Sequence, residues 1–312
     1  MLDHLGRSVQ YLRLSVTGAC DYRCAYCMPE GPAEGVREAL TATEFIEIAR
    51  QAAALGVNKV RLTGGEPLAR GDILDICRGV SALDGIETLC MTTNASRLAR
   101  LAKDLRAAGV GCVNISIDSL KPERYREITR CGRLEDAMGG LFAALDAGFD
   151  RVKVNTVLIG GLNDDEIVDF VALTRDHPID VRFIELMPIG PSTAWPGERF
   201  ISAQTVLERC PGLTPVGRSG VSERYRMPGH MGGVGLIRPI TGCFCAECDR
   251  IRVTADGMLK PCLHACREIP LKGLAGEALR EEIARGILEK PRAHALNEGA
   301  SRSQRPMNAI GG

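Results

Sequence analysis

The sequence predicts an α/β protein, an incomplete (β/α)6 barrel of the TIM type followed by a C-terminal extension. Two observations lead to this fold. Six strand-like segments alternate with helical segments between residues 11 and 186, and a polar or cysteine-rich stretch stands at the end of each strand. Strands that are joined through helices by short links imply right-handed crossovers and a parallel sheet.

The predicted strands are short apolar or alternating runs, and the predicted helices carry apolar residues near a 3.6-residue period. The strands span residues 11–16, 57–63, 86–92, 110–117, 151–159 and 180–186. The helices between them span residues 42–55, 73–83, 96–108, 134–147 and 164–175. Asn163, followed three residues later by Glu166, predicts a capping box at the start of the last helix.

The position of the functional-looking residues favours a partial barrel over a doubly wound sheet. Six units are too few for a closed eight-stranded barrel. Candidate residues end or follow all six strands, namely the cysteine loop after residue 16, GGEP (64–67), TTN (92–94), SID (116–118), Lys153 with Asn155, and ELMP (185–188). A barrel collects its site at the C-terminal ends of every strand, whereas a doubly wound sheet concentrates it at one switch point.

The pattern changes after about residue 190, where Pro and Gly become frequent and strand signals become short. We therefore divide the chain into a barrel domain, residues 1–190, and a C-terminal extension, residues 191–312. Within the extension we expect a strand around 250–257 and a helix over 276–290. The last dozen residues, SRSQRPMNAIGG, look like a tail.

The composition excludes several classes of function. Lys+Arg and Asp+Glu both number 39, so bulk charge gives no reason to expect a nucleic-acid or membrane-surface partner. The first ten residues lack the apolar stretch of a signal peptide, and no segment approaches the roughly 20 apolar residues of a membrane span. We expect a cytoplasmic protein whose 13 cysteines are metal ligands and buried thiols rather than disulfides.

Three cysteines in CDYRCAYC, Cys20, Cys24 and Cys27, have C-x3-C-x2-C spacing directly after the first predicted strand. Such a triad can hold a cubane iron–sulfur cluster and leave one iron open for a substrate or cofactor. The alternative is a zinc site that is completed by a distant histidine. No histidine stands at a ligand-like spacing from this loop, so we favour the cluster.

A second triad, Cys245, Cys248 and Cys262, has C-x2-C-x13-C spacing in the extension. It again leaves an open iron if it binds a cluster. A zinc ribbon that uses Cys243 or Cys266 as fourth ligand is the alternative, and spacing does not exclude it. Arg250 and Arg252 lie between the ligands on one face of a predicted strand, where two guanidiniums suit an anionic substrate such as a polyphosphate.

The cysteine loop followed by GGEP resembles the radical S-adenosylmethionine superfamily. With the second triad the resemblance narrows to the GTP 3′,8-cyclase family of molybdenum cofactor biosynthesis. It covers nearly the whole chain, including YLRLSVT, VRLTGGEPL, VNISIDSL, VRFIELMPIG, FCAECDRIRVTADGMLKPCL and the terminal RPMNAIGG. The resemblance implies conversion of GTP to (8S)-3′,8-cyclo-7,8-dihydroguanosine 5′-triphosphate, with two [4Fe–4S] clusters and S-adenosyl-L-methionine (SAM) as cofactors.

The resemblance also implies roles for individual residues. The first cluster would be held by Cys20, Cys24 and Cys27, and the second by Cys245, Cys248 and Cys262. SAM would contact Tyr26, Gly65, Ser116 and Met187. GTP would contact Arg13, Arg61, Thr92, Lys153, Arg250, Ile251 and Arg252. Catalysis would involve Arg250, Arg252 and the two terminal glycines, Gly311 and Gly312, because the tail of this family reaches into the active site.

The implied partners are GTP, a second copy in a homodimer, a flavodoxin-type electron donor and, downstream, cyclic pyranopterin monophosphate synthase. Two alternatives stay open. One is a radical SAM enzyme with an auxiliary cluster that acts on another nucleotide or on a peptide. The other is a non-catalytic iron–sulfur carrier or zinc-stabilised binding module, which would leave GGEP and the six functional loops unexplained.

Overall fold

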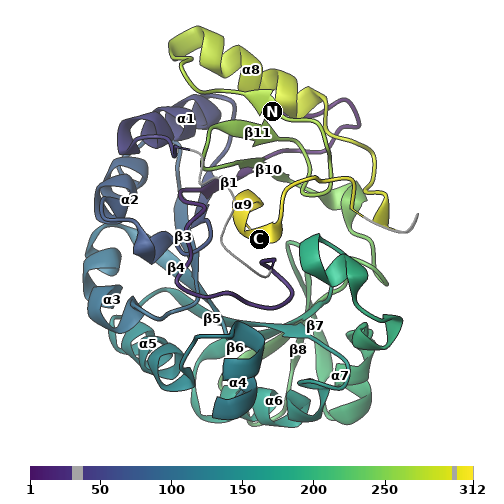
Figure 1. The fold of residues 1–312 in the computed structure, drawn as a ribbon. Coiled ribbons are helices and arrows are strands. Elements are labelled where there is room, and N and C mark those ends of the chain that lie inside the picture. The colour runs from purple at the N-terminus through teal and green to yellow at the C-terminus, as the bar shows by residue number, and fades with distance from the viewer. Residues whose placement is uncertain (30–37, 297–300, 312) are drawn as a thin grey trace.

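The structure, a computed structural model, describes residues 1–29, 38–296 and 301–311. Its centre is a curved twelve-stranded sheet with the strand order β12-β11-β10-β1-β2-β3-β4-β5-β6-β9-β8-β7. Figure 1 shows the sheet bending around a central space, with helices packed on its outer side. The two end strands, β12 and β7, do not pair with each other, so the barrel is open as the sequence predicts.

All six predicted strands are present, as β1 (Tyr11–Ser15), β2 (Lys59–Thr63), β3 (Thr88–Thr93), β4 (Val110–Ser116), β5 (Arg151–Leu158) and β6 (Ile179–Glu185). Neighbours among them pair in parallel. The residues after 190 add strands at both ends. On one side lie β9 (Gly233–Ile237), β8 (Ser222–Arg226) and β7 (Thr214–Ser219), and on the other β10 (Arg250–Val253), β11 (Met258–Lys260) and β12 (Ile269–Pro270).

The outer helices follow the predicted ranges, as α1 (Ala42–Ala54), α2 (Ile73–Ser81), α3 (Leu98–Ala107), α5 (Leu134–Asp146) and α6 (Ile167–Asp176). A capping box between Thr41 and Glu44 begins α1. The extension adds α7 (Gln204–Arg209), α8 (Gly276–Leu288) and α9 (Met307–Ile310). The sequence analysis missed α4 (Pro122–Thr129), a short and mostly polar helix that begins with a proline.

The predicted capping box at Asn163 and Glu166 is wrong. Asn163 makes no side-chain cap, and a short 3-10 turn over Asp164–Glu166 precedes α6. The Asn163 amide instead donates to the carbonyls of Asp118 and Val157. Glu166 accepts hydrogen bonds from Ser119 and Arg124, because both of its carboxylate oxygens face the loop after β4.

The strands divide their side chains between the core and the barrel interior. On β1, Leu12 and Leu14 are buried in the hydrophobic core, whereas Arg13 between them faces the central cavity. This alternation follows from the two-residue period of a strand. The core lies between the sheet and the outer helices, and it leaves the interior to polar residues. Within the described residues, no helix has the length and apolar character to cross a membrane.

Candidate active site

The interior of the curved sheet holds a cavity of about 370 Å³ at the C-terminal ends of the strands. Most of the predicted site residues line it: Cys20, Cys24, Cys27, Tyr26, Gly65, Ser116, Met187, Arg13, Arg61, Thr92, Lys153, Arg250, Arg252, Cys245, Cys248 and Cys262. The sheet therefore brings both cysteine triads and the predicted cations to one space.

Ile251 does not line the cavity. Its side chain is fully buried in the hydrophobic core and it pairs in register with Leu12. Only its backbone is left for a ligand. Gly312 lies outside the described residues.

The first triad lies on the loop after β1. Burial raises the pKa of both Cys20 and Cys27 to about 12. A desolvated thiolate needs a compensating positive charge, which an iron cluster would supply. The loop is preorganised, because the Cys20 sulfur accepts from the backbone N–H of Tyr22 at 3.4 Å and Cys27 receives a hydrogen bond from the backbone of Asn308. These three residues fit a cluster.

The GGEP loop packs tightly against the cysteine loop. The Gly65 N–H donates to the Thr17 carbonyl at 2.7 Å, and a Cβ at Gly65 would lie 2.3 Å from the Ala19 carbonyl oxygen. Only glycine fits this approach. Glu66 then accepts from the Thr93 hydroxyl and the Asn94 N–H, both at 2.7 Å, and ties GGEP to TTN. Burial raises the pKa of Glu66 to about 7.

Tyr26 is fixed by Asp118, which the sequence analysis included in SID without assigning it a role. Its hydroxyl donates to Asp118 Oδ2 at 2.7 Å, and the other carboxylate oxygen accepts from the Val157 N–H. Burial raises the pKa of Asp118 to about 6. Asp118 ends the SID stretch after β4, so its place beside the site was visible in the sequence, but its partner was not.

Three arginines form a row across adjacent strands. Arg13 on β1 pairs in register with Arg252 on β10 and with Arg61 on β2. Neighbouring strands lie about 4.8 Å apart, so three guanidiniums crowd one stretch of the wall. Burial and the charge of Arg252 lower the pKa of Arg13 well below its usual value. Such a row is stabilised when an anion enters the cavity.

Arg61, from this row, and Arg250, its neighbour on β10, both contact Tyr11. Arg61 donates to the Tyr11 hydroxyl at 2.5 Å and to the Met91 carbonyl at 2.7 Å. Although burial opposes it, the charge of Arg61 helps to lower the pKa of Tyr11 to about 8. Arg250 stacks over the Tyr11 ring, 5.5 Å from its centroid. Tyr11 thus helps to hold Arg61 and Arg250 in place.

The next strands add cations and amide groups. Asn155 on β5 pairs in register with Arg182 on β6, and Lys153 lies on the same face of β5. Burial and the charge of Arg182 lower the pKa of Lys153 to about 7. Asn114 Oδ1 and Asn155 Oδ1 are buried and find no hydrogen-bond partner among the described residues. These oxygens are available to N–H or hydroxyl donors of a ligand.

The second triad has a cation beside it. Lys290 is almost fully buried, and its ammonium group donates to Cys248 Sγ at 3.5 Å and to the Arg250 carbonyl at 2.7 Å. Burial alone would raise the pKa of Cys248, but the charges of Lys290 and Arg250 lower it overall. The thiolate is favoured here, as metal ligation requires.

The tail enters the cavity. Figure 1 shows α9 inside the curve of the sheet, beside β1 and β10. The Gly311 carbonyl accepts from Arg252 at 2.8 Å and from Arg13 at 3.3 Å. Gly311 has a φ of +68°, and a Cβ there would lie 2.2 Å from Thr63 Oγ1. The chain thus needs glycine at this position.

Sequence reasoning missed Arg182, Tyr11 and Lys290, and it named Asp118 within SID without giving it a role. Arg182 had a usable signal, because it stands on a predicted strand and alternates with the apolar residues on either side. Lys290 had none, because its contact with Cys248 spans 42 residues and depends on how α8 packs.

Comparison with known proteins gives two family matches. Residues 14–174 match the radical SAM superfamily, and residues 179–296 match the family described as Molybdenum Cofactor Synthesis C. Proteins named GTP 3′,8-cyclase are similar over the full chain. That of Alkaliphilus oremlandii is 46% identical and covered completely, and that of Peptoclostridium acidaminophilum is 47% identical with 98% of its length covered.

Solved structures share the fold at low identity. Streptococcus suis SuiB bound to the precursor peptide SuiA superposes with a TM-score of 0.65 at 15% identity, over 96% of this chain and 67% of SuiB. Native anSMEcpe with bound AdoMet superposes with a TM-score of 0.57 at 13% identity, over 95% of this chain and 84% of the other.

Proposed function

Because the chain belongs to the GTP 3′,8-cyclase family of the radical SAM superfamily, we propose that it converts GTP to (8S)-3′,8-cyclo-7,8-dihydroguanosine 5′-triphosphate, the first step of molybdenum cofactor biosynthesis. The observation that carries the proposal is the row of Arg252, Arg13 and Arg61 on the wall of a cavity into which both cysteine triads open. A polyphosphate substrate suits that row, because bidentate guanidinium–phosphate pairs are strong when desolvated.

The superfamily carries a [4Fe–4S] cluster and binds SAM. We assign the cluster to Cys20, Cys24 and Cys27, and SAM to the neighbouring residues Tyr26, Gly65, Ser116 and Met187. When bound and reduced, this pair would supply a 5′-deoxyadenosyl radical able to take the 3′ hydrogen of the ribose. Bonding of C3′ to C8 would then leave an unpaired electron on the guanine, which one further electron and one proton must quench to give the product. The chain's own task is to position the ribose and to exclude other hydrogen donors.

Positioning of GTP falls to the cations and amides of the wall. Arg13, Arg61 and Arg252 would hold the triphosphate, with Lys153 and Thr92 beside them. Asn114 and Asn155 would accept from ribose or guanine donors, since their buried oxygens lack partners among the described residues. Ile251 would contribute only backbone.

A second [4Fe–4S] cluster on Cys245, Cys248 and Cys262 completes the proposal. Lys290 favours the thiolate at Cys248, and Arg250 and Arg252 lie on the strand that follows. Arg250 would stabilise charge that develops on the guanine after ring closure, while Arg252 acts on the triphosphate. Gly311 would act by holding Arg13 and Arg252 in register, and we assign Gly312 to the same function. In this scheme residues 1–190 bind SAM, and residues 191–312 supply the second cluster and the tail.

The further partners follow from the family. We propose a homodimer, a flavodoxin-type electron donor, and cyclic pyranopterin monophosphate synthase as the enzyme that takes the product. We place the protein in the cytoplasm, where a reducing environment protects the cysteines. A peptide substrate is disfavoured, because the cavity wall carries many buried cations and a neutral peptide would leave them uncompensated.

The test uses anaerobically reconstituted protein with dithionite, SAM and GTP that carries deuterium at C3′. Mass spectrometry follows the label into 5′-deoxyadenosine. Deuterium transfer together with cyclised product is the expected result. Unlabelled 5′-deoxyadenosine would keep the superfamily chemistry but reject this substrate position. An absence of 5′-deoxyadenosine from cluster-replete protein would overturn the proposal.

A further inference from the structure

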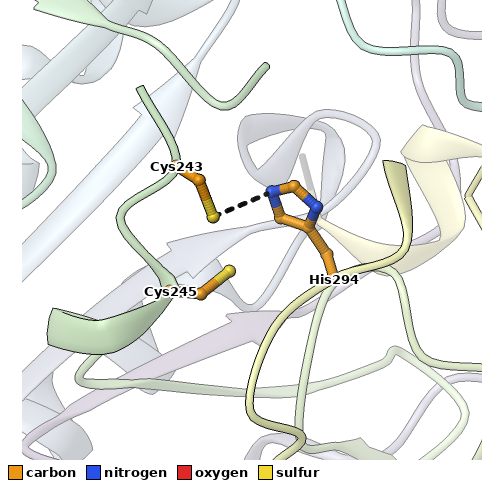
Figure 2. Close-up of side chains that lie close together, drawn as sticks. All are labelled: Cys243, Cys245 and His294. Atoms are coloured by element: carbon orange, nitrogen blue, oxygen red, sulfur yellow. Dashed lines mark hydrogen bonds between the residues drawn. The ribbon is translucent and has the colours of Figure 1, made fainter. Parts of the chain in front are cut away.

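A second group of metal-ligating side chains lies at the edge of the proposed auxiliary cluster. Cys243 precedes the 3-10 turn Cys245–Glu247 and Cys245 begins it, whereas His294 lies in the segment after α8. Cys243 Sγ is 3.8 Å from His294 Nε2, and the ligand atoms of all three residues lie within 4.8 Å of one another. Figure 2 shows both sulfurs turned toward the imidazole ring.

The spacing fits a single metal ion better than a cubane cluster. Tetrahedral zinc has Zn–S bonds of about 2.3 Å and Zn–N bonds of about 2.0 Å, so its ligand atoms stand roughly 3.5 to 3.8 Å apart. The three atoms here need to close by about 1 Å at most to reach that geometry. A cubane carries its thiolates on different irons and needs them farther apart.

The imidazole is held from both sides in the metal-free protein. His294 Nδ1 accepts from the Leu296 N–H at 3.3 Å, and Nε2 is 3.0 Å from the Pro239 carbonyl. The ring proton therefore sits on Nε2. A metal ion would replace that proton and give up the Pro239 contact, so the ligands are preorganised but occupancy is reversible. The His264 ring packs edge-on against His294, with centroids 5.1 Å apart.

We propose that Cys243, Cys245 and His294 form a mononuclear site for a thiophilic divalent cation, with Zn²⁺ as the ion that fits best. Two thiolates and one imidazole fill three of the four positions of a tetrahedral ion. Because Cys243 is exposed, solvent can reach the fourth position. This proposal rests on the proposed function in one respect. Cys245 is also a ligand of the second cluster, so the two metal centres exclude each other.

The first test measures Zn²⁺ binding to the cluster-free full-length chain, reduced and stripped with a chelator. Cobalt serves as the spectroscopic probe, because its thiolate charge-transfer absorption reports sulfur ligands, and Zn²⁺ then displaces it. We expect one ion per chain. Cys243→Ala and His294→Ala should each weaken Zn²⁺ binding by at least roughly 100-fold, the upper end of what the loss of an outer partner costs.

Two cysteine variants are the controls. Cys266→Ala removes an exposed cysteine outside the trio, and Cys262→Ala removes a ligand of the triad alone. Both should bind Zn²⁺ as the wild type does. Loss of binding in Cys262→Ala with retention in Cys243→Ala would show a zinc ribbon on the triad and overturn the proposal.

The second test measures competition with the cluster. Wild-type chain that is loaded with Zn²⁺ before reconstitution should take up iron and sulfide for one cluster instead of two. Cys243→Ala should take up both clusters with or without Zn²⁺. If Cys243→Ala itself loses cluster iron in the absence of zinc, Cys243 is a cluster ligand and the proposal fails. A wild type that never forms a second cluster would reject the proposed function while leaving the zinc titration intact.

Discussion

The two cysteine triads open into one cavity but lie in opposite electrostatic surroundings. Near the first triad are carboxyl groups: burial is the main cause of the raised pKa of Cys20 and Cys24, and Glu66 and Asp21 add to it at Cys20 as Asp118 does at Cys24. Near the second are cations, since Lys290 and Arg250 lower the pKa of Cys248. The difference matches the proposed ligands, because a sulfonium cofactor is a cation and a nucleoside triphosphate is an anion.

The strongest test of this contrast removes one ligand from each triad. Cys24→Ser should abolish both 5′-deoxyadenosine and cyclised product. Cys262→Ser should retain part of the SAM cleavage while losing the product, because the substrate would be misplaced. Chromatography of 5′-deoxyadenosine and product under anaerobic conditions measures both. Cys266→Ser is the control, and normal cyclisation by Cys262→Ser would remove the second triad from the mechanism.

The cationic half of the contrast is tested at Arg252. Arg252→Ala should raise the KM for GTP by about 10- to 100-fold, because a charge-assisted hydrogen bond contributes about 1.5 to 3 kcal/mol. SAM binding should not change, since SAM is assigned to the side of the cavity near the first triad, where the carboxyl groups lie. The KM of Arg252→Lys should lie between that of the wild type and that of Arg252→Ala, because lysine keeps the positive charge but lacks the planar guanidinium. A KM equal to that of the wild type would exclude Arg252 from the phosphate site.

The C-terminal tail contacts both sides of the cavity, the first cysteine loop and strand β10, and Arg305 holds it in place. The Arg305 guanidinium donates to Asp256 at 2.9 and 3.0 Å and to Glu268 at 2.7 Å, and Asn308 reaches the Gly18 carbonyl in the first loop. Arg305→Ala should lower kcat by about tenfold, less than the roughly 100-fold that a displacement of about 1 Å at the reacting centre can cost.

Steady-state kinetics and thermal melting measure the effect of Arg305→Ala. The melting temperature should stay near that of the wild type, and Arg305→Lys should recover part of kcat. Arg267→Ala, which removes an exposed arginine paired with Glu289, is the matched control. Equal kcat in both alanine variants would show that Arg305 does not position the tail.

The smallest expected effect is a pH dependence at Lys153. Burial and Arg182 lower its pKa to about 7, with Arg61 acting in the same direction and Asp180 opposing it. Above pH 7 the lysine loses its charge in the free enzyme, so GTP affinity should fall several-fold between pH 6 and 8. Lys153→Arg should make GTP affinity less dependent on pH. GTP itself titrates equally with both proteins, so the difference between their two pH profiles reports the lysine alone. Parallel profiles would contradict this role.

The sequence predicted what depends on local periodicity and on short motifs. The six barrel strands alternate or run apolar, so their positions could be read directly, and so could the cysteine loops that follow them. Strand β7 escaped because it is largely exposed and has no apolar pattern. Helix α4 escaped because its apolar residues are few.

Contacts between distant segments could not be read in the same way. The register that places Arg13 between Arg61 and Arg252 depends on the pairing of β10 with β1, which no local pattern specifies. The approach of His294 to Cys243 and of Lys290 to Cys248 depends equally on how the segment around α8 returns to the sheet.

The pairing of β10 with β1 also sets an order of events during synthesis of the chain. The partner of Arg13 emerges from the ribosome roughly 240 positions after it, which takes about 12 to 48 s at ordinary translation speeds. Until then the nascent barrel has an unpaired edge at β1, and contacts this distant form slowly. During that interval the wall beside the first cysteine loop would be incomplete, which would leave the loop accessible from that side.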